Sequence, residues 1–83
     1  MVFKRKNIGT CSRSTTVEIE NNIIKNIQFE GGCDGNLKGI ASLCVGMSVD
    51  DVIARVKGIR CGMKKTSCPD QLALALEEAK TQM

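Results

Sequence analysis

The feature that most constrains this chain is its five cysteines, which are spread over only 83 residues. Four of them lie beside glycines, in turn-like segments or just before a predicted helix, whereas Cys44 falls within an apolar stripe. A chain this short buries a marginal hydrophobic core, and such chains often gain stability from a metal, disulfides or oligomerisation. The sequence therefore predicts a single domain over residues 1–83 in which the cysteines either stabilise the fold or form a functional site.

The composition excludes several classes of function. Histidine is absent, which rules out Ser–His and Cys–His catalytic pairs and leaves thiolates as the ligands for any soft metal. Aromatic residues make up only 2% of the chain, and the net charge is only +3. Proteins that bind single-stranded nucleic acid stack bases on aromatic side chains, so we expect no nucleic-acid partner.

The distribution of apolar residues predicts a cytoplasmic protein with no membrane partner. No stretch approaches the roughly 18 apolar residues of a transmembrane helix, and no apolar run follows the basic residues 4–6 as in a signal peptide. Thiols stay reduced in the cytoplasm, and an odd number of cysteines argues against a secreted disulfide framework.

The first third of the chain has a β pattern. A short edge strand is expected within residues 2–8, and residues 15–20 alternate between polar and apolar. Asn21 and Asn22 form a plausible two-residue hairpin turn, since asparagine tolerates positive φ. Residues 23–29 would then be the partner strand, giving two or three antiparallel strands.

Simple alternation assigns the apolar residues of that last strand to two faces. Ile23, Ile27 and Phe29 share one face by their spacing, whereas Ile24 is expected on the other.

The remainder of the chain has a helical pattern. Three helices are expected. The first covers about 36–45, and the second follows a capping sequence in which Ser48 is the N-cap and Asp51 stands three residues later. The third begins at Pro69, since proline is favoured at the first position of a helix. The stripes expected to face the core are Leu37, Ile40, Ala41 and Cys44; Val49, Val52, Ile53 and Val56; and Leu72, Ala75, Leu76 and Ala79. The predicted fold class is α+β: a two- to three-stranded antiparallel sheet followed by three helices packed on one face.

The other four cysteines are candidates for a single metal site. Cys33 and Cys68 stand at predicted helix starts, where the helix dipole lowers the pKa of a thiol, and Cys11 and Cys61 adjoin turn residues or glycine. Four thiolates can complete a tetrahedral zinc site or hold an iron–sulfur cluster. We therefore predict zinc or an iron–sulfur cluster bound by Cys11, Cys33, Cys61 and Cys68.

Spacing alone leaves alternatives open. No Cys-x-x-Cys pair occurs, so the fold would have to gather these residues, and free cysteine can also act as a small buried hydrophobe. We prefer the interpretation as a small buried hydrophobe for Cys44, because Cys44 lies on an apolar stripe. A Cys61–Cys68 disulfide, or a redox pair in which Cys68 is the more acidic thiol, is also compatible with the sequence.

Residues 66–70 read Thr-Ser-Cys-Pro-Asp, and the chain resembles the TSCPD-domain family over nearly its whole length. Supporting motifs are Gly-Thr-Cys-Ser at 9–12, Gly-Gly-Cys-Asp-Gly-Asn at 31–36 and Cys-Gly at 61–62. Small members of the family carry four cysteines. The domain also forms the C-terminus of adenosylcobalamin-dependent ribonucleotide reductases, and short members share the name ribonucleoside-diphosphate reductase.

That resemblance implies an accessory role in ribonucleotide reduction, a reductase as partner, and cobalamin only through that association. A chain of 83 residues is too small to supply a catalytic barrel and a cobalamin site, so it is not a reductase by itself.

The order of elements is also distantly similar to iron–sulfur scaffolds of the NifU N-terminal type. Cys11, Cys33 and Cys68 match the places of the three scaffold cysteines. Arg13 and Ser67 stand where those scaffolds have an aspartate and a histidine, the groups associated with a labile cluster. The similarity implies a cluster scaffold as a further alternative, whereas closure by four thiolates suits a stably held metal better.

Overall fold

The protein is described by a computed structural model that covers residues 1–32 and 34–82. The first part of the chain is a three-stranded antiparallel sheet in the order β1-β2-β3, formed by Val2–Lys6, Ser12–Glu20 and Ile23–Gly31. The predicted edge strand and both hairpin strands are thus confirmed, although β2 begins earlier than its alternating pattern suggested.

The hairpin between β2 and β3 contains both a predicted and an unpredicted feature. Asn21 and Asn22 adopt positive φ angles of 51° and 64°, as expected for the two central residues of a tight turn. Beyond the turn the register shifts: Ile19 pairs with Ile24, but Glu18 pairs with Asn26, so β3 carries one extra residue. This bulge changes which side chains of β3 face the helices.

The bulge corrects the face assignment made from alternation. Ile24 and Ile27 are both buried in the same core, although three positions separate them. Ile23 is only half-buried and instead forms an isolated bridge with Ser48. The prediction that Ile24 lies on the face opposite Ile27 was therefore wrong, because a strict period of two fails across an inserted residue.

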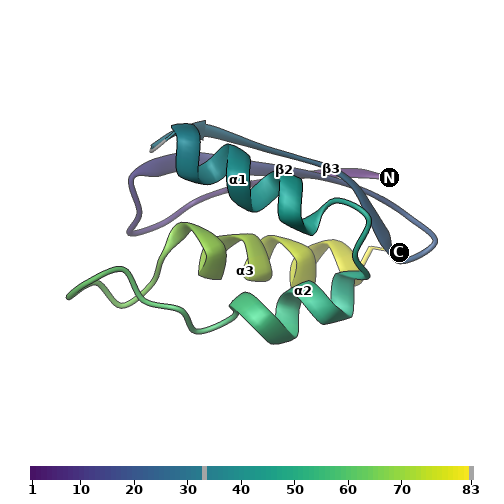
Figure 1. Cartoon of the computed structure of the whole chain (residues 1–83). Coiled ribbons are helices and arrows are strands. Elements are labelled where there is room, and N and C mark those ends of the chain that lie inside the picture. The colour runs from purple at the N-terminus through teal and green to yellow at the C-terminus, as the bar shows by residue number, and fades with distance from the viewer. Residues whose placement is uncertain (33, 83) are drawn as a thin grey trace.

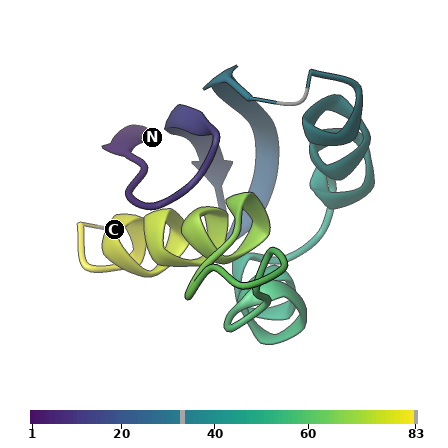
Figure 2. The ribbon, with the colours of Figure 1, turned by 90° about the vertical axis from the view of Figure 1, so that its left-hand side faces the viewer.

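Three helices follow the sheet and lie on one side of it (Figure 1). They are α1 (Asp34–Cys44), α2 (Val49–Val56) and α3 (Cys68–Lys80). Helix α3 packs against β2 and β1, α1 packs against β3, and α2 packs against α3 (Figure 2). The predicted α+β class is confirmed. None of these described helices is both long and apolar enough to cross a membrane.

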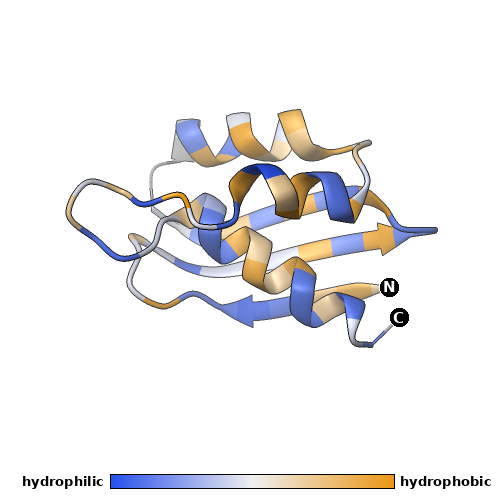
Figure 3. Ribbon diagram, turned by 90° about the horizontal axis from the view of Figure 1, so that it is seen from below, coloured by the Kyte–Doolittle hydropathy of each residue, from blue (hydrophilic) through white to orange (hydrophobic). Residues whose placement is uncertain are grey.

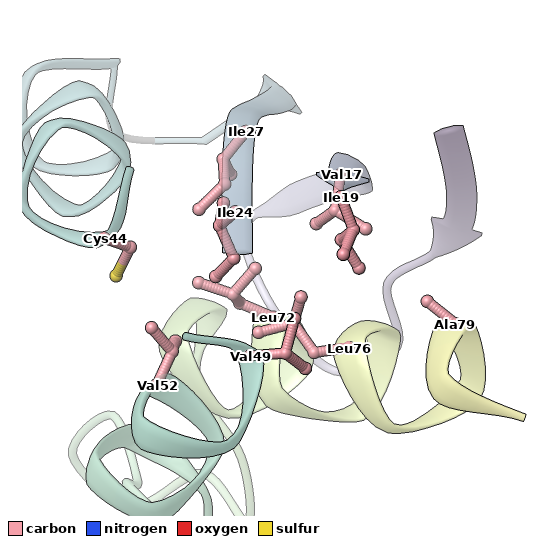
Figure 4. Close-up of a cluster of buried hydrophobic side chains, with 10 residues drawn as sticks. All are labelled: Val17, Ile19, Ile24, Ile27, Cys44, Val49, Val52, Leu72, Leu76 and Ala79. Atoms are coloured by element: carbon pink, nitrogen blue, oxygen red, sulfur yellow. The ribbon is translucent and has the colours of Figure 1, made fainter. Parts of the chain in front are cut away.

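The core lies between the sheet and the helices, as Figure 4 shows. Its buried members are Val17, Ile19, Ile24, Ile27, Cys44, Val49, Val52, Leu72, Leu76 and Ala79. The predicted stripes of α2 and α3 face inward, and Cys44 is buried among apolar side chains, which confirms its interpretation as a core residue. The core is aliphatic, and both phenylalanines pack at its margin.

Two connections and two helix starts lie together at one end of the molecule. The turn between β1 and β2, the loop between α2 and α3, and the first turns of α1 and α3 all lie at the end opposite both chain termini (Figure 1). Successive strands and helices run in opposite directions along the molecule, so every second connection between them lies at the same end.

Candidate thiolate site

Two of the four predicted ligands meet at the N-terminus of α3. Cys68 is the first residue of that helix and is only 8% exposed, whereas Cys11 lies exposed in the turn before β2. Their sulfur atoms are 3.8 Å apart. Ser67 caps the helix, since its Oγ accepts a hydrogen bond of 3.1 Å from the backbone N–H of Asp70. The helix terminus therefore presents Cys68 directly to the Cys11 turn.

A buried polar chain connects β2 to Cys68. Thr15 Oγ1 donates to Asn7 Oδ1 at 2.9 Å, and Asn7 Nδ2 donates to Ser12 Oγ at 2.7 Å. Ser12 Oγ in turn lies 3.0 Å from Cys68 Sγ. Because the Ser12 oxygen already accepts from Asn7, its own proton is available for the sulfur. The chain is thus oriented to donate toward Cys68, which favours a thiolate there.

The pKa of the Cys68 thiol reflects two opposing influences. Burial is the largest single influence and raises the pKa, but hydrogen bonds from the hydroxyl and backbone of Ser12, with smaller ones from Cys11 and Thr10, outweigh it and leave the pKa below its usual value. For Cys44, burial acts alone and raises the pKa. The pKa values of the two buried cysteines therefore shift in opposite directions, that of Cys68 down and that of Cys44 up.

Gln71 holds the two cysteine-bearing loops against α3. Its side chain is only 3% exposed, and its Oε1 accepts a hydrogen bond of 3.1 Å from the backbone N–H of Ile8. Its Nε2 donates to Thr66 Oγ1 at 3.0 Å. One buried amide thus connects the turn that carries Cys11 to the loop that precedes Cys68, which positions both sulfurs.

Cys61 lies near this pair but does not complete a ligand set. Its N–H donates to the Thr66 carbonyl at 3.1 Å, and its own carbonyl accepts from Lys64 N–H at 3.0 Å, so it opens a local turn. Cys11, Cys61 and Cys68 all line one open groove of about 560 Å³. Within residues 1–32 and 34–82, however, no three potential ligands are close enough to hold a metal.

The predicted ligand set thus divides into three parts. Cys11 and Cys68 are brought together, Cys61 lines the same groove at a greater separation, and Cys33 lies outside the described residues.

The separation of the Cys11 and Cys68 sulfurs tests whether this pair fits a metal. Two thiolates on one tetrahedral ion with metal–sulfur bonds of about 2.3 Å stand about 3.8 Å apart. The observed sulfur–sulfur distance is 3.8 Å. The pair is therefore spaced as two ligands of one tetrahedral ion would be.

The supporting residues of this site were not anticipated from the sequence. Asn7, Ser12 and Thr15 are buried polar residues on or beside β2, and Gln71 is a buried polar residue of α3. Their roles depend on contacts between distant segments: 63 positions separate Ile8 from Gln71, and 56 separate Ser12 from Cys68. The one available signal was that β2 begins with small hydroxyl side chains where an alternating strand would have apolar ones.

The fold and the site define a small α+β domain with a cysteine pair presented at a helix N-terminus. Comparison with known families then identifies it: the TSCPD domain family matches residues 1–80. The chain therefore belongs to the TSCPD domain family, as its motifs indicated. No curated protein and no solved structure matches it, so the similarity to NifU-type scaffolds stays a prediction.

Proposed function

We propose that this protein is a small thiolate metal-binding module that holds zinc or an iron–sulfur cluster through Cys11, Cys33, Cys61 and Cys68. The observation that carries the proposal is the 3.8 Å separation of the Cys11 and Cys68 sulfurs, which equals the ligand spacing of a tetrahedral ion. Bound there, the ion would join the β1–β2 turn to the start of α3.

The surroundings of Cys68 support the proposal. The Ser12 hydroxyl lies 3.0 Å from its sulfur, as expected of an outer partner that orients a thiolate ligand. Cys61 lines the same groove, and Cys33 directly precedes the first residue of α1 in the sequence. Cys61 is exposed, and Cys33 is next to the first residue of α1 in the sequence, so each is a candidate to complete the coordination of the ion.

Metal analysis of protein purified without oxygen tests this function. We expect about one equivalent of zinc, or iron with matching sulfide and visible absorption, in the wild type. Cys68→Ser should lose that metal, whereas Cys44→Ala should retain it, because Cys44 is buried in the core away from the pair. Metal-free wild-type protein, whose thermal unfolding is unchanged by zinc or by cluster reconstitution, would contradict the proposal.

A second candidate, a cysteine redox relay, is favoured by the same pair. The two sulfurs are in contact at 3.8 Å and would close to about 2.05 Å in a disulfide, and the pKa of Cys68 is lowered. Oxidation would join Cys11 and Cys68, and the two electrons and two protons would pass to a disulfide of the partner, reducing it to two thiols. A ribonucleotide reductase is the partner implied by the family, and the relay would be accessory to nucleotide reduction.

Equilibration of the metal-free protein in glutathione buffers of graded potential separates the two candidates. A relay predicts a reversible Cys11–Cys68 disulfide that Cys11→Ser abolishes and Cys61→Ser preserves. Thiols of the metal-free protein that form no reversible disulfide over this range would argue against the relay. A reversible Cys61–Cys68 disulfide would assign the relay to that pair instead.

A further inference from the structure

The open groove beside the cysteine pair extends well beyond the sulfurs. One wall is α1, which contributes Gly39, Ile40 and Leu43, and the other is formed by residues 59–61 together with 67–69. Helix α1 has 11 residues and is therefore about 16 Å long, which matches about five residues of extended chain. The α1 wall, which runs from Gly35 to Leu43, is thus long enough to lie beside a short extended peptide.

The lining of this groove is apolar and accessible. Leu43 is 78% exposed and Ile59 is 44% exposed, although both are large aliphatic side chains. Gly39, one helical turn before Leu43, has no atom within 4 Å of where a Cβ would stand, so this wall is open. Large apolar side chains left accessible around a concave surface mark a site of interaction.

A loop rich in cations borders the groove: Arg60 lines it, and Lys64 and Lys65 follow in the same loop, whose two ends are hydrogen-bonded to the Asp70 carboxylate. Residues 58–69 contain Arg60, Lys64 and Lys65 and no acidic residue. These three cations make no ion pair in the described part of the chain, whereas other cations do: Lys4 with Glu30, Arg5 with Glu78, Lys57 with Glu77, and Lys80 with Asp50. In Figure 3 this loop projects from the end of the molecule, with hydrophilic and apolar residues interspersed.

We propose that this groove binds an extended acidic segment of a partner protein that carries at least one bulky apolar side chain. The apolar side chain would pack on Leu43 and Ile59, and flanking carboxylates would lie near the unpaired cations of the loop. Such a segment would cover Cys61 and the Cys68 end of the groove. The inference goes beyond the proposed function, because it requires no metal and no redox step.

Selection from a random peptide library displayed on phage, against the immobilised full chain, tests the proposal. We expect recovered peptides to be rich in aspartate and glutamate around a leucine, isoleucine or phenylalanine. The best peptide, labelled with fluorescein, is then titrated by anisotropy. Its affinity should fall as NaCl is raised from about 50 to about 500 mM, since part of the interaction is electrostatic.

Matched variants locate the binding surface. Leu43→Ser should weaken binding about tenfold, whereas Val2→Ser, at an exposed apolar side chain on β1, should leave it unchanged. Replacing Lys64 and Lys65 by glutamate should abolish binding, whereas Lys25→Glu on the exposed face of β3 should not. Gly39→Gln fills the groove while improving helix propensity, so it should lose binding with equal or higher thermal stability.

Several results would overturn the inference. Recovered peptides that are basic or uncharged, or no enrichment over a blank surface, would exclude an acidic occupant. Binding unaffected by Leu43→Ser and Gly39→Gln would exclude the groove as the binding surface. Sedimentation that shows self-association of the wild type, but not of Leu43→Ser, would assign the groove to a second copy instead. Binding of anionic vesicles or oligonucleotides with no peptide enrichment would assign the cations to another polyanion.

Discussion

At the scale of single residues, Ser12 determines the chemistry of the cysteine pair. Its Oγ accepts a hydrogen bond from Asn7 and lies 3.0 Å from Cys68 Sγ, so the hydroxyl proton of Ser12 is directed toward that sulfur. Burial raises the pKa of both Cys68 and Cys44, and the Ser12 hydroxyl is the largest of the influences that lower the pKa of Cys68.

Ser12→Ala should therefore raise the pKa of Cys68. In metal-free protein, the midpoint of the pH dependence of Cys68 alkylation by iodoacetamide should move to higher pH, because a thiolate-stabilising hydrogen bond is lost. The measurement is the alkylation rate of each cysteine by peptide mass spectrometry. Cys61 is the internal control, and an unchanged Cys68 profile would show that Ser12 does not act on the sulfur.

At the scale of elements, the loop between α2 and α3 is held in place by the helix that follows it. Asp70 Oδ1 accepts a hydrogen bond of 2.7 Å from the backbone N–H of Gly58, and its other oxygen accepts one from Thr66 Oγ1. One carboxylate in the first turn of α3 therefore fixes both ends of residues 58–66, and with them the position of Cys61.

The stability of this loop should depend on pH. The Thr66 hydroxyl and then the Gly58 N–H lower the pKa of Asp70. The stabilisation is therefore complete above the ordinary pKa of aspartate, about 4, and is lost as pH falls through the lower pKa of the folded state. Limited proteolysis within residues 58–66 should accelerate below about pH 4 in the wild type.

Asp70→Asn provides the comparison for that pH dependence. It should be cleaved faster at neutral pH and show little further change on acidification, because its side chain does not titrate. Equal cleavage of the two proteins at neutral pH would show that the carboxylate does not hold the loop.

A second element-scale prediction concerns the end of β3. Gly32 has a φ of +79°, and a Cβ there would lie 3.0 Å from Leu37 Cδ1 and 3.1 Å from the Ser12 backbone nitrogen. Gly32→Ala should therefore lower the free energy of unfolding by about 2–4 kcal/mol, combining left-handed strain with overpacking.

Gly58→Ala is the matched control for Gly32→Ala. Its φ is +86°, but an added Cβ would have nothing within 4 Å, so it should cost only about 1–2 kcal/mol. Both values are measured by urea denaturation, and equal losses would exclude the close packing of Gly32 against β2.

At the scale of the whole molecule, Ile24 joins the sheet to the helices. Its side chain is fully buried, its N–H donates to the Met47 carbonyl at 3.0 Å, and its carbonyl accepts from Gly46 N–H at 2.8 Å. The α1–α2 connection is thereby fixed to β3, and a single aliphatic core is shared by every layer of the fold.

Ile24→Ala should destabilise the entire domain. Truncation of a fully buried isoleucine removes about 2–5 kcal/mol, which is a large share of the stability of a chain of this size. Circular dichroism should show one cooperative transition at a much lower temperature. Ile8→Ala, at a side chain that is 67% exposed, is the control and should unfold as the wild type does.

The sequence by itself determined the class of fold, the family and the role of Cys44. Hairpin, capping and helical stripe signals are local, so they can be read without knowing what packs against them. The face of Ile24 could not be read in this way, because the bulge that inverts it arises from pairing with β2.

Only the tertiary structure decided which cysteines meet. Cys11 and Cys68 are 57 positions apart, and their sulfurs approach because β2 and α3 share the core and Gln71 holds both loops. The polar chain from Thr15 to Cys68 likewise depends on side chains that no spacing connects. Contacts between distant segments depend on how whole helices and strands pack together, and a local sequence pattern does not determine that packing.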